Sequence, residues 1–270
     1  MKSMPQTPPI IQTKNLCFSY REKPVLKDIS VSIYGGETWA VIGKNGAGKS
    51  TLIKCMAGLL PVCQQSVFIN GTDIARLKPR EVAKVIAYVP QAATPGLAPY
   101  TVFDFIMLGR FPYQGLMAIP NQNDKRIVKE ALRLADVENL GARLLTTLSG
   151  GEMQRVFLAG AVAQQSKILL LDEPSTFLDP FHHELMRKSL ERIHNEYGTV
   201  ILTITHDANS AISQFGNILA LNNGCQFFAG TVSDFKARCP DVLEEIFSIR
   251  FEEAQCVSSK RIIVVPGEMA

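Results

Sequence analysis

A glycine-rich loop followed by lysine and serine is the first place in this sequence where residue types and spacing predict chemistry. Residues 43–50 read Gly-Lys-Asn-Gly-Ala-Gly-Lys-Ser, which fits the phosphate-loop pattern G-x-x-x-x-G-K-[ST]. The apolar run 38–42 precedes the loop and a helical stretch, 50–60, follows it. Glycines let backbone N–H groups curl around phosphate oxygens, and the start of a helix adds partial positive charge. The loop therefore predicts a site for the phosphates of a nucleotide.

Two residues of this loop have separate expected roles. Lys49 should reach the β- and γ-phosphates, and the Ser50 hydroxyl should hold Mg²⁺. A glycine-rich turn with no ligand is the alternative interpretation. The residues expected to contact the nucleotide here are Gly43, Lys44, Asn45, Gly46, Ala47, Gly48, Lys49, Ser50 and Thr51.

Acidic and histidine side chains end two further apolar runs. Asp172 and Glu173 follow the run 168–171, and burying such acids is costly unless they bind a cation or take part in chemistry. In doubly wound folds, ligands lie beyond the carboxyl ends of the strands. We therefore expect Asp172 near Mg²⁺ and Glu173 beside an attacking water, although Asp172 would also serve as a helix cap. His206 ends the run 199–205 and would donate to the γ-phosphate.

A second serine-glycine loop opens a helix at Leu148-Ser149-Gly150-Gly151-Glu152. Ser149 and Glu152 have the spacing of a capping box, and two glycines in the first turn leave backbone amides accessible to an anion. One nucleotide does not need two such loops from one chain. We therefore expect a head-to-tail pair of chains in which this loop closes the partner's nucleotide; an ordinary capped helix is the alternative.

The elements that position these residues form a mixed pattern. The segments 10–20 and 28–34 read as antiparallel strands, and Asn70-Gly71 reads as a hairpin turn. Continuous apolar runs that alternate with helices indicate a parallel sheet covered on both faces. The stretch 99–148 is almost all helical, with Thr101 and Asp124 as expected N-caps.

Composition restricts the class of protein. The 270 residues are 46% hydrophobic and 20% charged, with a net charge of +3, which excludes a disordered or collagen-like chain. No basic run predicts nucleic-acid binding, and no apolar stretch approaches the roughly 20 residues of a membrane span. With no secretory signal and no C-x-x-C pair, we expect a cytoplasmic protein with free thiols. His182, His183 and His194 read as part of a solvated helical face.

Together these motifs resemble those of the ABC ATPases, in order and over nearly the whole chain. Residues 43–50 are similar to Walker A, Gln91 to the Q-loop, 148–154 to the signature motif and 168–172 to Walker B. The resemblance implies a P-loop NTPase core of mostly parallel sheet with helices on both faces, an N-terminal antiparallel piece and an inserted helical subdomain. The expected divisions are a tail 1–9 and a single ATPase domain 10–270, with core 10–91 and 149–232, helical subdomain 92–148 and C-terminal extension 233–270.

The resemblance also implies roles that spacing alone leaves open. Tyr20 would stack on adenine, although it would fit equally well in the core. Gln91 would join the Mg²⁺ site of Ser50 and Asp172 to the helical subdomain, and Asp179 of the D-loop would act across the dimer. The catalytic set would be Glu173, His206, Lys49 and Gln91, and the partner chain would supply Ser149, Gly150 and Gly151. Lys44 and Phe177 depart from the residues common in the family, proline and alanine.

A narrower resemblance appears within the helical stretch. Residues 108–115, Leu-Gly-Arg-Phe-Pro-Tyr-Gln-Gly, look like those of ATPases that power importers of ferric siderophores, haem and cobalamin. ATPases for other metals or oxyanions, and exporter ATPases, remain alternatives. Such a subunit would lie peripherally on the cytoplasmic face of the inner membrane, bound to permease subunits and served by an extracytoplasmic binding protein. The apolar stretch expected to dock a permease helix comprises Phe111, Tyr113, Leu116, Met117 and Ile119.

Overall fold

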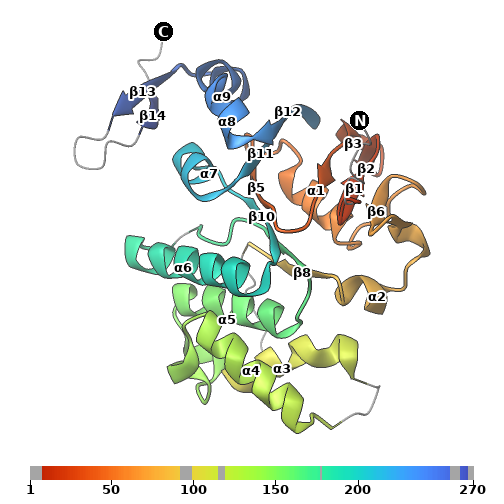
Figure 1. The fold of residues 1–270 in the computed structure, drawn as a ribbon, viewed down its shortest axis with the longest axis vertical. Helices are drawn as coiled ribbons and strands as arrows, with labels where there is room; N and C mark the ends of the chain where they lie inside the picture. The colour runs from red at the N-terminus through yellow and green to blue at the C-terminus, as the bar shows by residue number, and fades with distance from the viewer. Residues whose placement is uncertain (1–7, 92–98, 115–118, 177, 256–261, 267–270) are drawn as a thin grey trace, which may run out of the picture. The chain divides into compact units, whose positions relative to one another are not determined.

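The computed structural model describes residues 8–91, 99–114, 119–176, 178–255 and 262–266 (Figure 1). Leu116, Met117 and Phe177 lie outside these residues. The chain divides into two compact units: unit 1 comprises Met1–Arg76 and Leu202–Ala270, and unit 2 comprises Leu77–Ile201. Within the described ranges, no helix combines the length and the apolarity that a membrane span requires.

A small antiparallel sheet begins unit 1. Ile11 pairs with Ile33 on one side and with Ile69 on the other, and all three side chains are buried. Asn70 and Gly71 have φ of 48° and 77° between paired strands, as a type I′ turn requires, so the predicted hairpin turn is confirmed. In sheet order the strands are β4 (Ser32–Ile33), β1 (Ile11–Thr13), β6 (Val67–Ile69) and β7 (Thr72–Asp73).

The larger sheet of unit 1 carries the phosphate loop. Strand β5 (Thr38–Ile42) runs parallel to β11 (Asn217–Asn222), which turns back antiparallel to β12 (Cys225–Thr231). β5 is buried along almost its full length, as a strand covered on both faces must be. The sheet order is β2 (Leu16–Tyr20), β3 (Lys23–Ile29), β12, β11, β5 and β10 (Val200–Ile204), and helix α1 (Lys49–Met56) follows β5.

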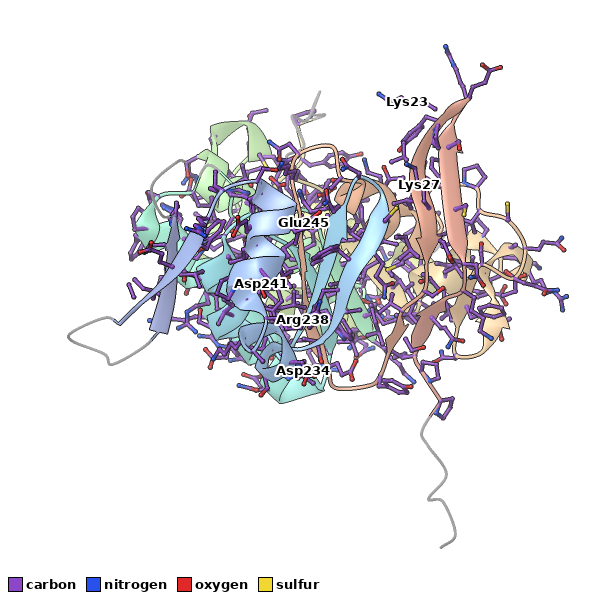
Figure 2. The ribbon with its side chains drawn as sticks, turned by 90° about the horizontal axis from the view of Figure 1, so that it is seen from above. Lys23, Lys27, Asp234, Arg238, Asp241 and Glu245 are labelled. Atoms are coloured by element: carbon purple, nitrogen blue, oxygen red, sulfur yellow. The ribbon has the colours of Figure 1, made fainter. Side chains whose placement is uncertain are left out.

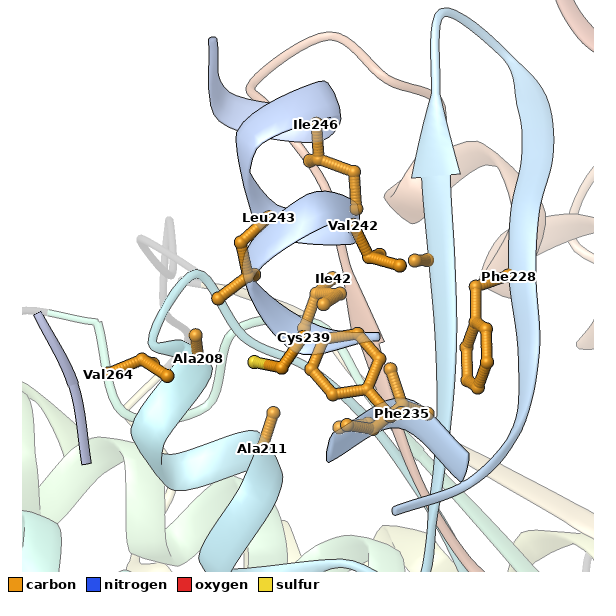
Figure 3. Packing of buried hydrophobic residues seen from close by; sticks show 13 residues of the cluster. Ile42, Ala208, Ala211, Phe228, Phe235, Cys239, Val242, Leu243, Ile246 and Val264 are labelled. Carbon is orange, nitrogen blue, oxygen red and sulfur yellow. The ribbon is translucent and has the colours of Figure 1, made fainter. Parts of the chain in front are cut away.

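The C-terminal extension packs into the core of unit 1. Helix α9 (Cys239–Phe247) buries Cys239, Val242, Leu243 and Ile246 at the i, i+3, i+4, i+7 spacing of one helical face, against Ile42 of β5 and other core residues (Figure 3). Its other face carries acids, including Asp241 and Glu245, and Arg238 lies at the start of the helix (Figure 2). Burying each large aliphatic side chain contributes about 1.5–3 kcal/mol, so this helix is an integral part of the unit.

The C-terminal region also contains helix α8, before α9, and a hairpin after it. Helix α8 (Val232–Lys236) precedes α9, and strands β13 (Phe251–Gln255) and β14 (Ile262–Pro266) pair antiparallel. Val264 of β14 is held by Asn209 of helix α7 (Ala208–Gln214): the Asn209 side chain donates to the Val264 carbonyl at 2.9 Å and accepts from the Val264 N–H at 2.8 Å. One side-chain amide thereby pairs with both backbone groups of a strand residue.

Unit 2 combines parallel strands with helices. β8 (Ile86–Val89) is parallel to β9 (Ile168–Leu171), with Val89 opposite Leu171. Its helical elements are α2 (Pro79–Ala83), α3 (Val102–Met107), η2 (Leu108–Tyr113), α4 (Gln122–Leu134), η3 (Glu138–Leu140), η4 (Leu145–Thr147), α5 (Gly150–Ala163) and α6 (Pro180–Tyr197). The α/β fold with an N-terminal antiparallel piece and a helical insertion is confirmed.

Of the two N-caps predicted for the inserted helices, one is confirmed and one is wrong. Thr101 accepts from the Asp104 N–H at 3.1 Å, so its predicted role as the N-cap of α3 is confirmed. The prediction that Asp124 caps α4 is wrong, because Asn121 is the N-cap and accepts from the Asp124 N–H at 2.9 Å. Asp124 is the third residue of the helix, and its side chain accepts a hydrogen bond from the Asn121 N–H, which completes a capping box.

Candidate nucleotide site

The phosphate loop of unit 1 needs glycine at two positions for steric reasons. A Cβ on Gly43 would lie 2.5 Å from the Leu221 carbonyl oxygen, so strand β11 leaves no room for a side chain. Gly48 has φ of 98°, and its Cβ would lie 2.8 Å from Leu26 Cδ2. Gly48 is also the N-cap of α1 and has no side chain to cap the helix. The first turn of α1 therefore has the backbone conformation and the uncapped start that a phosphate group fits.

Lys49 lies folded over the beginning of this loop. Its side chain is almost fully buried, at 5% exposed, and its Nζ donates to the carbonyls of Gly43 (2.8 Å) and Lys44 (3.0 Å). A buried ammonium requires such acceptors. The charge is therefore held at the mouth of the loop. Ala47 and Thr51 are also buried, whereas Asn45 and Gly46 are exposed.

Lys44 extends toward the C-terminal extension. Its Nζ donates to Ser248 Oγ at 2.7 Å. Ser248 ends helix α9 in the left-handed conformation, with φ of 57°. This contact links the loop to a residue 204 positions away in sequence, and no local pattern predicts it.

We expect Lys44→Ala to weaken ATP binding by less than about tenfold, because Lys44 is exposed and water competes for its bond to Ser248, whereas a tenfold loss requires about 1.4 kcal/mol. Titration with a fluorescent ATP analogue measures the affinity. Ser248→Ala should have the same effect, and the double variant should add nothing to either single one. A loss for Lys44→Ala alone that is as large as the loss for Lys49→Ala would instead mean that Lys44 contacts phosphate.

His206 and the phosphate loop leave adjoining strand ends in unit 1. The Thr205 N–H, directly after β10, donates to the Val41 carbonyl of β5 at 3.1 Å. His206 follows at once, and Asp207 then caps α7 by accepting from the Asn209 N–H at 2.9 Å. The backbone around His206 is therefore fixed on both sides, next to the strand that leads into the loop.

Tyr20 lies at the end of β2 and is 46% exposed. Its ring meets Phe18 edge to face, with centroids 4.9 Å apart. The exposure excludes a place in the buried core, which was the alternative interpretation of this residue. A ring held by a neighbouring ring, with area left accessible, is suited to stacking on a base.

The predicted acids of unit 2 lie at the end of β9, beside the end of β8. The Asp172 N–H donates to the Val89 carbonyl at 2.9 Å, which continues the parallel ladder. Asp172 is 3% exposed and accepts from the Tyr88 hydroxyl at 3.1 Å. The cap of the following helix is Asp179. Asp172 is therefore a buried carboxylate and has no capping role there.

Gln91 and Glu173 lie in direct contact. Gln91 Nε2 donates to Glu173 Oε2 at 2.8 Å, and the Thr176 hydroxyl donates to the same oxygen at 3.0 Å. Glu173 also has a φ of 48°, a conformation that costs a residue with a Cβ about 1–2 kcal/mol. The backbone strain and the two donors together fix the direction of this carboxylate.

The second loop has the capping box that its spacing predicted. The Ser149 N–H donates to Glu152 Oε2 at 2.8 Å, and the Glu152 N–H donates to Ser149 Oγ at 3.3 Å. A Cβ on Gly150 would meet no atom within 4 Å, whereas one on Gly151 would lie 2.7 Å from His182 Cδ2. The tip of α5 is therefore open at Gly150 and closed by His182 at Gly151.

His182 packs against the second loop, a contact that the expectation of a solvated helical face missed. Its Nδ1 lies 2.9 Å from Asp179 Oδ1, and its backbone N–H donates to the same carboxylate at 2.8 Å. These bonds, the backbone one first, lower the pKa of Asp179 below its usual range. Thr176 and Tyr88 were missed too, since only the fold places them beside the acids. No sequence pattern would have identified these three.

The polar side chains predicted to hold a metal ion carry oxygen donors, which suit a hard cation better than zinc. Among the described residues, no three His, Cys, Asp or Glu side chains lie together in a group that could hold a metal ion. Taken separately, the Ser50 hydroxyl of unit 1 and the Asp172 carboxylate and Gln91 amide of unit 2 offer oxygens of the kind that Mg²⁺ prefers. The burial of Asp172 is consistent with a carboxylate whose charge a cation balances.

Comparison with known proteins finds similar ATP-binding subunits of transporters. The chain is 35% identical over 253 residues to the iron(3+)-hydroxamate import ATP-binding protein FhuC of Bacillus subtilis (strain 168), covering 93% of this chain and 91% of that protein. It is 34% identical over 243 residues to the petrobactin import ATP-binding protein FpuC of Bacillus anthracis, covering 90% and 88%. The manganese transport system ATP-binding protein MntB of Listeria innocua is 35% identical over 210 residues, covering 77% and 85%.

Solved structures and a family model show the same likeness. A metal-chelate type ABC transporter in an inward-facing conformation matches with a TM-score of 0.82 and 25% identity, covering 96% of this chain and 98% of that chain. The dimeric bacterial ABC transporter cassette MJ0796 matches with a TM-score of 0.72 and 27% identity, covering 82% and 98%. The model of the family described as "ABC transporter" matches residues 26–176. The chain therefore belongs to the ABC transporter family, as an ATP-binding and ATP-hydrolysing subunit.

Proposed function

We propose that this chain powers a membrane importer of an iron-siderophore, haem or cobalamin. The observation that carries the proposal is the 35% identity to FhuC across 93% of the chain. The likeness of residues 108–115 to such importers supports the same class. The manganese relative keeps importers of other metals as the second candidate.

We assign the two groups of site residues to complementary tasks. In unit 1, Tyr20 stacks on adenine, the loop 43–51 binds the phosphates, and His206 donates to the γ-phosphate. In unit 2, Glu173 orients the attacking water, with Gln91 and Thr176 holding its carboxylate. Because phosphoryl transfer needs mainly positioning and charge stabilisation, fixed side chains are the chain's main contribution.

Mg²⁺ is part of this proposal. Ser50, Asp172 and Gln91 would hold the ion, which neutralises charge on the β- and γ-phosphates when bound. The Tyr88 hydroxyl orients the Asp172 carboxylate, so that its oxygens are fixed before the ion arrives.

We further propose that two copies of the chain bind two ATP molecules between them. The open tip of α5 at Ser149 and Gly150 would close the partner's nucleotide, with Asp179 acting across the same interface. The dimeric form of the MJ0796 cassette supports this arrangement. ATP then favours the paired state and hydrolysis releases it, which gives a two-state element.

The permease contact is assigned to residues 108–114, which we call the docking segment. Leu108, Phe111 and Tyr113 are 53%, 64% and 40% exposed there, and Ile119 beyond it is 90% exposed. Apolar side chains gathered on one short segment indicate a protein contact. In this proposal the chain lies on the cytoplasmic face of the membrane, beneath permease subunits that receive cargo from an extracytoplasmic binding protein.

Capture of the membrane partner tests the function directly. The tagged chain is purified in detergent from its own cells, the co-purifying permease is identified, and ATPase activity is measured with candidate cargoes. An iron-siderophore, haem or cobalamin that stimulates turnover supports the proposal. Stimulation only by manganese, or by a compound leaving the cell, would replace it with the second candidate or with an exporter.

We expect Ser149→Arg to abolish ATP-dependent pairing and to leave ATP binding by the single chain unchanged, because a bulky cation would occupy the open helix tip. Light scattering with ATP, in the Glu173→Gln background, measures the pairing. Loss of an N-cap costs about 1 kcal/mol by itself, so Thr101→Arg, which removes the cap of α3, is the matched control. Pairing that survives Ser149→Arg would contradict the two-loop arrangement.

A further inference from the structure

Arg110 is a buried cation in the middle of the docking segment. It is 4% exposed, and its Nε donates to Asp124 Oδ1 at 3.0 Å, with both side chains nearly inaccessible. A charge in such a place is tolerated only when it is paired and hydrogen-bonded. The pair therefore holds η2 against the first turn of α4 with little freedom to move.

The same guanidinium reaches the far end of the signature helix α5. Arg110 Nη1 donates to the carbonyl of Ala163, the last residue of α5, at 2.7 Å, and to Gln165 Oε1 at 3.0 Å. The neighbouring backbone is equally close, since a Cβ on Gly109 would lie 2.3 Å from the Gly160 carbonyl oxygen. The docking segment is thus fastened to the last turn of α5.

Buried and exposed side chains alternate along the docking segment. Arg110 and Pro112 are buried, whereas Phe111 and Tyr113 are largely exposed. The Arg110 guanidinium carbon also lies 4.4 Å from the Tyr113 ring centroid. Arg110 therefore connects an exposed aromatic side chain on one side of the segment to α5 on the other.

Helix α5 joins Arg110 to the open tip at Ser149. It spans 14 residues, or about 20 Å at 1.5 Å per residue, and its backbone hydrogen bonds make it a stiff rod. We propose that Arg110 is a positioning residue that transmits a nucleotide-dependent displacement of α5 to the docking segment. This inference rests on the proposed function in two respects: the contact of the α5 tip with the partner's nucleotide, and the contact of the docking segment with a permease.

Arg80 of α2 offers a matched control. Its Nε donates to the Pro112 carbonyl at 2.8 Å and its Nη2 to the Gln114 carbonyl at 2.6 Å. Arg80 therefore holds the same segment with the same chemical group, but from α2 instead of α5. Arg110→Lys removes the link to α5 and keeps a cation for Asp124, whereas Arg80→Lys loosens the segment without touching that link.

Hydrogen–deuterium exchange of the purified chain, with and without ATP in the Glu173→Gln background, tests the link. In the parent Glu173→Gln chain, ATP should change the amide exchange rate at residues 109–114 by about fivefold, which is a typical size for coupling between two sites. Arg110→Lys should abolish that change and keep the one at 149–155, and Arg80→Lys should keep both. No ATP-dependent change at 109–114 in the parent chain, or identical behaviour of the two lysine variants, would overturn the inference.

Two further measurements separate a folding defect of the variant, and a failure of the proposed function, from a failure of the inference about Arg110. If Arg110→Lys does not fold, the double variant Arg110→Met with Asp124→Asn removes the buried charges together, which costs far less than leaving one unpaired, and it should show the same loss. In the captured permease complex, Arg110→Lys should lower stimulated turnover about fivefold without changing the KM for ATP. If the parent chain captures no permease, the proposed function fails, while the exchange result still decides the inference.

Discussion

Replacing Glu173 with glutamine is expected to stop ATP turnover, keep ATP binding and trap the paired chains. Glu173 is fixed by a strained backbone and by donors from Gln91 and Thr176 to one carboxylate oxygen. Glutamine has nearly the same shape but cannot accept a proton from water, and a general base contributes about 10²–10⁴-fold to a rate. A turnover rate at least about 100-fold lower is therefore expected.

Phosphate release measures the turnover, and a sizing column run with ATP measures the pairing. Glu138→Gln is the matched control, because Glu138 is an exposed acid in the same unit, at the start of η3, and its change should leave both readouts as in the parent chain. A Glu173→Gln chain that elutes as a monomer with ATP, or that still turns over at the parent rate, would remove Glu173 from its assigned role.

Replacing Lys49 with alanine is expected to weaken ATP binding by about 10- to 100-fold. A hydrogen bond from a charged group contributes about 1.5–3 kcal/mol, and every 1.4 kcal/mol is tenfold in affinity. Lys49 is already positioned by the Gly43 and Lys44 carbonyls, so it requires little reorganisation before it binds phosphate. Turnover should fall still further, because the same cation stabilises the charge that develops in the transition state.

Titration with a fluorescent ATP analogue gives the affinity, and thermal unfolding without ligand checks that the loop still folds. Lys54→Ala is the control, since Lys54 lies on the last turn of the same helix, away from the loop, and its loss should leave affinity unchanged. Equal affinities for Lys49→Ala and the parent chain would exclude the loop as the phosphate site.

Local patterns predicted the parts of this molecule that depend on near neighbours. The Asn70-Gly71 turn, the Thr101 cap and the Ser149–Glu152 capping box are all confirmed. Each depends on backbone geometry within about four residues, which sequence spacing specifies directly. The Asp124 prediction failed within the same range, because Asn121 was available one turn earlier and Asp124 is held by Arg110.

Contacts between distant residues could not be predicted in this way. The Lys44–Ser248 bond, the packing of His182 on Gly151 and the link from Arg110 to Ala163 join residues that no periodicity relates. They arise when whole elements pack, so the fold has to be known first. The site residues were recognisable because their chemistry lies at strand ends and helix starts; their supporting residues were not.

Cys55 lies in α1, directly after the phosphate loop, and is fully buried. Burial also raises the pKa of its thiol to about 12, so the thiolate form that reacts with alkylating reagents is scarce near neutral pH. A reagent can modify Cys55 only after α1 has separated from its neighbours. The rate of that modification under native conditions therefore reports how often the helix that follows the loop opens locally.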